Sequence, residues 1–142
     1  MGFCGIEVPM VGRDRAPKIL VVDDDRDIRL VLGAILEGAG YETVEAANGL
    51  EALALVKAER PDVVLLDLSM PRMDGMEVLR HLRANPETAG IPVVMVTASG
   101  DQDQASMAVA GGAFAYVVKP WDTHEIERTV AAGLRMPGSH AT

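Results

Sequence analysis

The chain has 142 residues, a length that suits one domain built around one hydrophobic core. Its hydrophobic fraction is 49%, aromatic residues make up only 4%, and the formal net charge is −8. This composition argues against a nucleic-acid-binding face and favours partners with basic surfaces. The single cysteine, Cys4, excludes an internal disulfide and fits a reducing compartment.

The first segment, residues 1–16, contains three glycines and no apolar periodicity, so we expect a flexible N-terminal extension. It lacks the basic start and the long apolar stretch of a signal peptide. No apolar run in the chain approaches the roughly 18 residues of a transmembrane helix, so we expect no membrane insertion. A cytoplasmic protein is the resulting expectation.

Five short apolar segments follow, and turn-forming or acidic residues bound most of them. Between them, apolar residues recur at helical spacing. We therefore expect strands at residues 18–23, 41–46, 62–67, 91–97 and 114–118.

The segments between the strands predict helices with one apolar face each. The first three faces are formed by Ile28, Leu32, Ile35 and Leu36, by Leu50, Leu53 and Val56, and by Met76, Leu79 and Leu82. A fourth helix is expected at about 101–110, and the last begins at Asp122 or Thr123 and ends before Pro137. Asp25 is expected to cap the first helix, and Asp74-Gly75 indicates a turn and a helix cap.

Strands that alternate with helices predict right-handed βαβ units and a parallel sheet covered on both faces. Five such units suit an α/β, doubly wound, flavodoxin-like fold with strand order 2-1-3-4-5. We expect this domain to span residues 17–135, followed by a short tail at 136–142. The tail is too short for a DNA-binding or catalytic output domain, so we expect a single-domain protein.

Two apolar strands end in carboxylates, and in this fold ligands bind at that edge of the sheet. The first strand ends in Asp23-Asp24-Asp25, and the third ends in Asp67. Carboxylates brought close together repel one another and resist ionising together. Mg²⁺ relieves that repulsion and typically uses only a few carboxylates. The sequence therefore predicts a Mg²⁺ pocket with one carboxylate left to react.

The other strand ends supply a hydroxyl and an ammonium, which suit a phosphoryl group on Asp67. The fourth strand ends in Thr97, and Tyr116 in the fifth precedes Lys119-Pro120. This ordered set resembles the receiver domain of two-component response regulators, the CheY-like family. The resemblance covers about residues 18–134, most of the chain.

The resemblance assigns a role to each residue of the set. It implies that Asp67 is the phosphoacceptor, an activated carboxylate nucleophile. It implies Mg²⁺ ligands at Asp23, Asp24, Asp67 and the backbone carbonyl of Ser69. Thr97 and Lys119 would contact the phosphoryl oxygens, and Thr97 and Tyr116 would form the conformational switch. The Lys119–Pro120 peptide bond would be cis.

The resemblance also implies partners. A sensor histidine kinase or a histidine phosphotransfer protein would donate the phosphoryl group. A downstream protein would bind the face formed by the fourth helix (about 101–110), the fifth strand and the fifth helix. We expect no catalysis beyond self-dephosphorylation, no nucleic-acid binding, and a monomer or weak dimer.

Three alternatives are open on the residues alone. An aspartyl-phosphate phosphatase generally carries an acid two residues after its nucleophile, where this chain has Ser69. A flavodoxin-like cofactor carrier needs a phosphate-binding loop after the first strand, where this chain has three acids. A receiver-like binding module would keep the fold and act without phosphorylation.

Two serines bear on the lifetime of an aspartyl phosphate. In the receiver family the residues two beyond Asp67 and Thr97 border the path of attacking water, and here they are Ser69 and Ser99. Both are too short to orient a water molecule well, so we expect slow to intermediate self-dephosphorylation.

Overall fold

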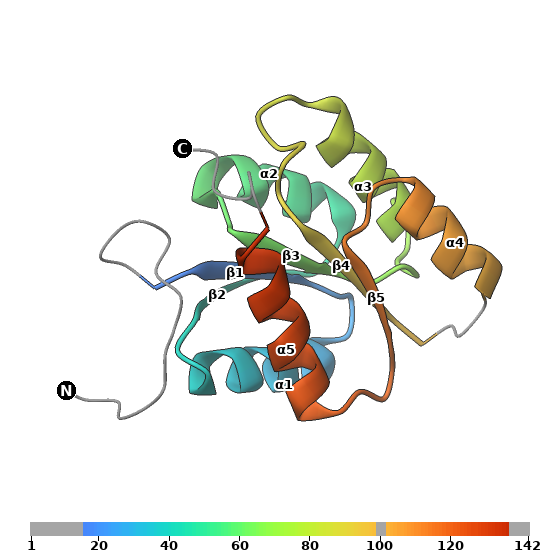
Figure 1. The fold of residues 1–142 in the computed structure, drawn as a ribbon. Coiled ribbons are helices and arrows are strands. Elements are labelled where there is room, and N and C mark those ends of the chain that lie inside the picture. Colours follow the sequence, from blue (N-terminus) through green and yellow to red (C-terminus); the bar gives the residue numbers. More distant parts are fainter. Residues whose placement is uncertain (1–15, 99–101, 137–142) are drawn as a thin grey trace.

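A computed structural model describes residues 16–98 and 102–136 and contains a five-stranded parallel sheet (Figure 1). The strand order is β2-β1-β3-β4-β5, which confirms the predicted 2-1-3-4-5 topology. The strands are β1 (Lys18–Val22), β2 (Glu42–Ala46), β3 (Val63–Leu66), β4 (Val93–Thr97) and β5 (Ala115–Val118). Each predicted strand ends within two residues of the observed one.

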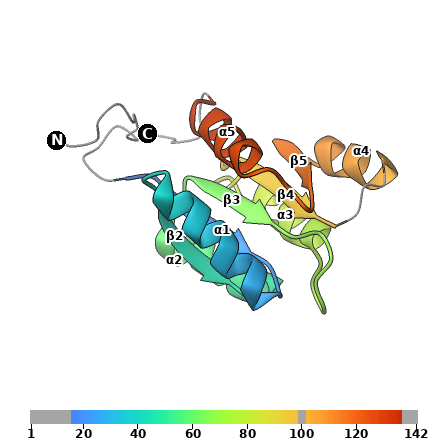
Figure 2. The same ribbon diagram turned by 90° about the horizontal axis from the view of Figure 1, so that it is seen from below.

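Five helices cover the two faces of the sheet (Figures 1 and 2). They are α1 (Arg26–Gly38), α2 (Gly49–Glu59), α3 (Gly75–Ala84), α4 (Gln102–Ala110) and α5 (Thr123–Leu134). Helices α1 and α5 lie on one face, and α2, α3 and α4 lie on the other. Within the described ranges, no helix is long and apolar enough to cross a lipid bilayer.

Successive side chains of a strand point to opposite faces of the sheet, so the hydrophobic core has two halves. In β1, Ile19 and Val21 pack toward α1 and α5, whereas Leu20 and Val22 pack on the opposite face. All four side chains are buried, because both faces of a parallel sheet are covered by helices. The continuous apolar runs in the sequence follow from this two-sided burial.

Acidic side chains begin three of the helices. Asp25 accepts a hydrogen bond from the amide of Asp27 and caps α1, as predicted. Asp74 forms a reciprocal capping box with Glu77 at the start of α3. Asp122 caps α5, which settles the choice between Asp122 and Thr123.

The predicted apolar face of α2 is wrong at Leu50, whose exposed fraction is 58%. The helix instead buries Gly49, Ala52 and Val56. A Cβ atom on Gly49 would lie 2.9 Å from a Val78 side-chain carbon, so the missing side chain lets α2 approach α3 closely. This close approach sets the rotation of α2 and leaves Leu50 facing outward.

The two predicted terminal segments fall mostly outside the described residues. Residues 1–15, which include Cys4, and residues 137–142 are not described. The N-terminal extension and the short C-terminal tail therefore stay predictions.

Candidate functional site

Three carboxylates meet at the carboxyl ends of β1 and β3. Ligand oxygens of Asp23, Asp24 and Asp67 all lie within 4.8 Å of one another. Asp23 and Asp67 are buried, with exposed fractions of 2% and 5%, whereas Asp24 is exposed. The parallel arrangement causes this meeting, because β1 and β3 are adjacent and end at the same edge.

Asp23 is held by its neighbours on both its backbone and its side chain. Its amide donates to the carbonyl of Ala46 at the end of β2, at 3.2 Å. Its Oδ1 accepts from the Asp25 amide at 2.9 Å, and its Oδ2 accepts from Lys119 Nζ at 2.8 Å. Asp23 is therefore a fixed member of the cluster.

The backbone of Asp67 is anchored, but its carboxylate is held more loosely. The Asp67 amide donates to the carbonyl of Val22 at 2.9 Å, which continues the pairing of β1 and β3. The side-chain Oδ1 accepts from the Ser69 amide at 3.4 Å and lies 3.8 Å from Lys119 Nζ. A carboxylate with such long contacts has lone pairs available for a new bond.

The environment of Asp67 opposes its ionisation. Burial, followed by the charge of Asp23, raises the pKa of Asp67 from 3.8 to about 6. Lys119 and the Ser69 amide act in the opposite direction, and Asp24 adds a smaller upward effect. One ammonium group therefore does not balance the three carboxylates. A hard divalent cation with oxygen ligands fits this donor set, and the identity of that cation as Mg²⁺ stays a prediction.

Lys119 reaches the cluster from the end of β5 and contacts both buried carboxylates. Its shortest ion pair is with Asp23, at 2.8 Å. The distance to Asp67 is 3.8 Å, so the ammonium lies between the two buried carboxylates. The Lys119–Pro120 bond is cis, in agreement with the resemblance. The role of Lys119 toward a phosphoryl group stays a prediction.

Thr97 and Tyr116 lie on two neighbouring strands, β4 and β5. Thr97 ends β4, is 1% exposed, and pairs in register with Val118. Tyr116 in β5 pairs with Met95 and packs against the core half under α2, α3 and α4. The switch role of these two residues stays a prediction, and Ser99 lies outside the described residues.

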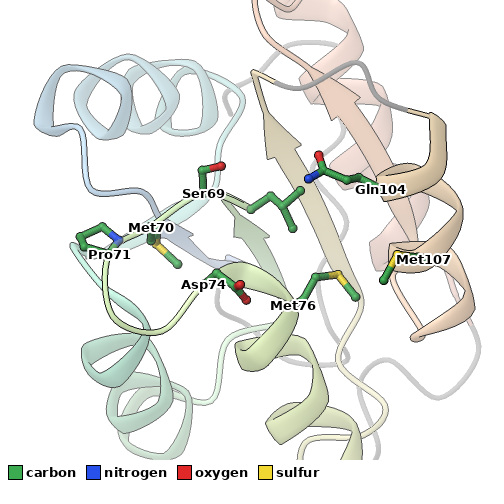
Figure 3. Close-up of a pocket in the computed structure, with 8 residues that line it drawn as sticks. Ser69, Met70, Pro71, Asp74, Met76, Gln104 and Met107 are labelled. Carbon is green, nitrogen blue, oxygen red and sulfur yellow. The ribbon is translucent and has the colours of Figure 1, made fainter.

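A hollow of about 570 Å³ opens beside the loop that follows Asp67 (Figure 3). It lies between the loop that follows β3 and helix α4, and Met76 and Met107 border it from α3 and α4. Its remaining lining residues are Leu68, Ser69, Met70, Pro71, Asp74 and Gln104. The exposed Ser69 therefore contributes both to this open surface and, through its amide, to the contacts of the buried Asp67.

Gly75 supports Asp67 in a way that the sequence analysis missed. Its amide donates to the carbonyl of Leu68 at 2.8 Å. A Cβ atom at this position would collide with the carbonyl oxygen of Asp67 and lie 2.8 Å from the Cα atom of Leu68. In the sequence, Asp74-Gly75 indicates a turn and a helix cap but not this contact, because the proximity to Asp67 arises from the fold.

Comparison with known proteins agrees with this geometry. The family profile of the response regulator receiver domain matches residues 19–131. The chain is 43% identical over 113 residues to sporulation initiation phosphotransferase F of Bacillus subtilis. This match covers 80% of this chain and 90% of that protein. The chain is 42% identical over 118 residues to the DNA-binding response regulator MtrA of Mycobacterium tuberculosis. That match covers 83% of this chain but only 50% of MtrA.

Solved structures show the same fold. Chemotaxis protein CheY4 of Vibrio cholerae superposes with a TM-score of 0.79 at 34% identity, covering 83% of this chain and 98% of that one. The receiver domain of NtrX from Brucella abortus gives a TM-score of 0.78 at 32% identity, covering 83% and 98% of the two chains.

Proposed function

The chain belongs to the response regulator receiver family, and from this premise we propose that it accepts a phosphoryl group on Asp67. The donor is a phosphohistidine on a sensor kinase or a histidine phosphotransfer protein. The observation that carries the proposal is the state of Asp67, a buried carboxylate with only long contacts, beside two further carboxylates and one ammonium.

The transfer itself is a displacement at phosphorus. An Asp67 carboxylate oxygen bonds to phosphorus, the phosphorus–nitrogen bond of the donor breaks, and its electron pair stays on the imidazole nitrogen. Positioning and charge neutralisation provide most of the catalysis in such transfers. Lys119 is already between Asp23 and Asp67 and would pair with a phosphoryl oxygen. Thr97 would donate its hydroxyl to another.

Asp23, Asp24, Asp67 and the Ser69 carbonyl would hold Mg²⁺, which when bound offsets the negative charge of the carboxylates and of the phosphoryl oxygens. Of the three carboxylates, only that of Asp24 belongs to an exposed residue, because Asp23 and Asp67 are buried.

The output is a change in the surface formed by α4, β5 and α5. Movement of the Thr97 hydroxyl toward the phosphoryl group would favour an inward Tyr116 and shift the protein between two populated states. Hydrogen exchange with and without the phosphoryl mimic beryllofluoride measures this shift. We expect the largest differences in α4 and β5, and differences confined to α1 would contradict this output route.

The test of phosphoacceptance uses a small phosphodonor. With acetyl phosphate and Mg²⁺, the intact mass should rise by one phosphoryl group, and Asp67→Asn should stay unmodified because an amide is a far weaker nucleophile. Asp25→Asn is the matched control, since it removes a nearby charge while Asn still caps α1. Equal labelling of the wild type and Asp67→Asn would contradict the proposal.

A further inference from the structure

Arg29, for which the sequence predicted no role, connects three elements beside the carboxylates. It lies in α1, and its Nη1 donates to the backbone carbonyl of Asp23 at 2.7 Å. Its Nε forms a 3.0 Å ion pair with Glu45 in β2. The Arg29 side chain is mostly buried, with an exposed fraction of 14%. One guanidinium group therefore joins α1, the end of β1 and β2.

We infer that Arg29 is a positioning residue that holds the loop between β1 and α1 so that Asp23 and Asp24 present their carboxylates together to a divalent cation. This inference rests on the proposed function, because that function requires the cation. The inference goes beyond the proposed function because it assigns the placement of the ligands to a residue that touches neither the cation nor the phosphoryl group.

Asp24 is the carboxylate whose placement depends most on this loop. Among residues 16–98 and 102–136, no described hydrogen bond or ion pair restrains its carboxylate, and the side chain is exposed. The backbone therefore decides where its Cα–Cβ bond points and which positions its carboxylate can reach. The Asp23 carbonyl belongs to the peptide group that joins Asp23 to Asp24, and Arg29 donates to that carbonyl. A restraint on this peptide plane therefore limits the positions that the Asp24 carboxylate can reach.

The shape of the guanidinium matters as much as its charge. Arginine presents several N–H groups in a fixed planar fork, so one side chain can hold a carbonyl and a carboxylate simultaneously. Glu45 orients this fork through Nε, and the Asp23 carbonyl receives Nη1. A lysine at position 29 would keep the charge, but its single ammonium cannot reproduce both directed contacts.

A positioning role and a purely electrostatic role predict changes of opposite sign. Arg29 carries a positive charge close to the carboxylates, so by Coulomb repulsion its removal should tighten the binding of Mg²⁺. If Arg29 positions the ligands, its removal should weaken the binding of Mg²⁺ although the repulsion between Arg29 and the cation is also removed. Loss of a hydrogen bond that orients metal ligands typically lowers metal affinity by about 10- to 100-fold.

The experiment titrates the full chain with Mg²⁺ and measures the dissociation constant by calorimetry. We expect Arg29→Met to bind about tenfold more weakly than the wild type, and Arg29→Lys to bind more weakly too although its charge is unchanged. Arg26→Met is the matched control, because Arg26 is exposed at the start of α1 and makes no described side-chain contact. Its affinity should be unchanged or slightly tighter.

A second measurement, on the metal-free protein, tests the loop directly. Arg29→Met should accelerate amide hydrogen exchange at residues 23–26, where the Asp25 amide bonds to Asp23 Oδ1, while the sheet keeps its protection. Faster exchange throughout the sheet would indicate lost stability and overturn the inference. If Arg29→Met binds Mg²⁺ with the affinity of the wild type, the positioning role of Arg29 is overturned while the proposed metal site is not. A wild type that binds no Mg²⁺ would overturn the metal site as well.

Discussion

Replacement of Asp67 by Asn should stabilise the metal-free protein. The pKa of Asp67 is raised from 3.8 to about 6 by burial and by Asp23, so the folded state disfavours the ionised carboxylate. A shift of this size corresponds to about 3 kcal/mol of destabilisation once the group is ionised in both states. An Asn amide leaves part of its hydrogen-bonding capacity unmet there, so we expect a net gain of about 2 kcal/mol.

The sign of the pH dependence follows from the raised pKa. The folded state holds the Asp67 proton more tightly than the unfolded state, so this contribution to stability falls as pH rises from about 4 to 6. Above pH 6 the cost is fully present, and below pH 4 it is absent. The gain from Asp67→Asn should therefore be complete at pH 8 and nearly vanish near pH 4.

Urea unfolding in the presence of EDTA measures this gain through the transition midpoint at an unchanged slope. Asp25→Asn is the control, since it removes an exposed charge at the same edge, retains the cap, and should change stability by about 0.5 kcal/mol or less. Loss of stability in Asp67→Asn at pH 8, or a gain that is equal at pH 4 and pH 8, would refute the reasoning.

Three further predictions concern the metal, the backbone and the phosphoryl lifetime. Mg²⁺ should raise the melting temperature by mass action, and Asp24→Asn should reduce that rise; equal rises in both proteins would argue against Asp24 as a ligand. Gly75→Ala should destabilise the fold by about 2 kcal/mol or more in urea unfolding, because the added Cβ collides with the backbone of Asp67; an unchanged midpoint would show that the loop can yield. Ser69→Asn combined with Ser99→Glu should accelerate the loss of phosphate from Asp67, measured as intact mass over time, and should have little effect on Mg²⁺ affinity. An unchanged rate of phosphate loss would contradict the role of the two serines.

The sheet and the position of the site could be predicted because they depend on patterns that are local in the sequence. The apolar runs of β1, β3 and β4 are strands covered on both faces, and a run that ends in acids places those acids at one edge. The meeting of Asp23, Asp24 and Asp67 follows from these two facts.

The rest depends on contacts between distant segments. The exposure of Leu50 follows from the close approach of α2 and α3 at Gly49. Lys119 Nζ lies 2.8 Å from Asp23 and 3.8 Å from Asp67, and no sequence pattern encodes which of the two carboxylates is nearer. The contact of Arg29 with the Asp23 carbonyl likewise requires the final placement of α1 against β1.

The most direct test of the central claim is to locate the phosphoryl group by mass spectrometry. After treatment with acetyl phosphate and Mg²⁺, reduction with borohydride converts an aspartyl phosphate to homoserine, and peptide sequencing identifies the residue. We predict homoserine at position 67 alone, with Asp23 and Asp24 unmodified, since these two would hold the cation. Homoserine at position 23 or 24, or no conversion in protein whose Mg²⁺ binding has been demonstrated, would contradict the account.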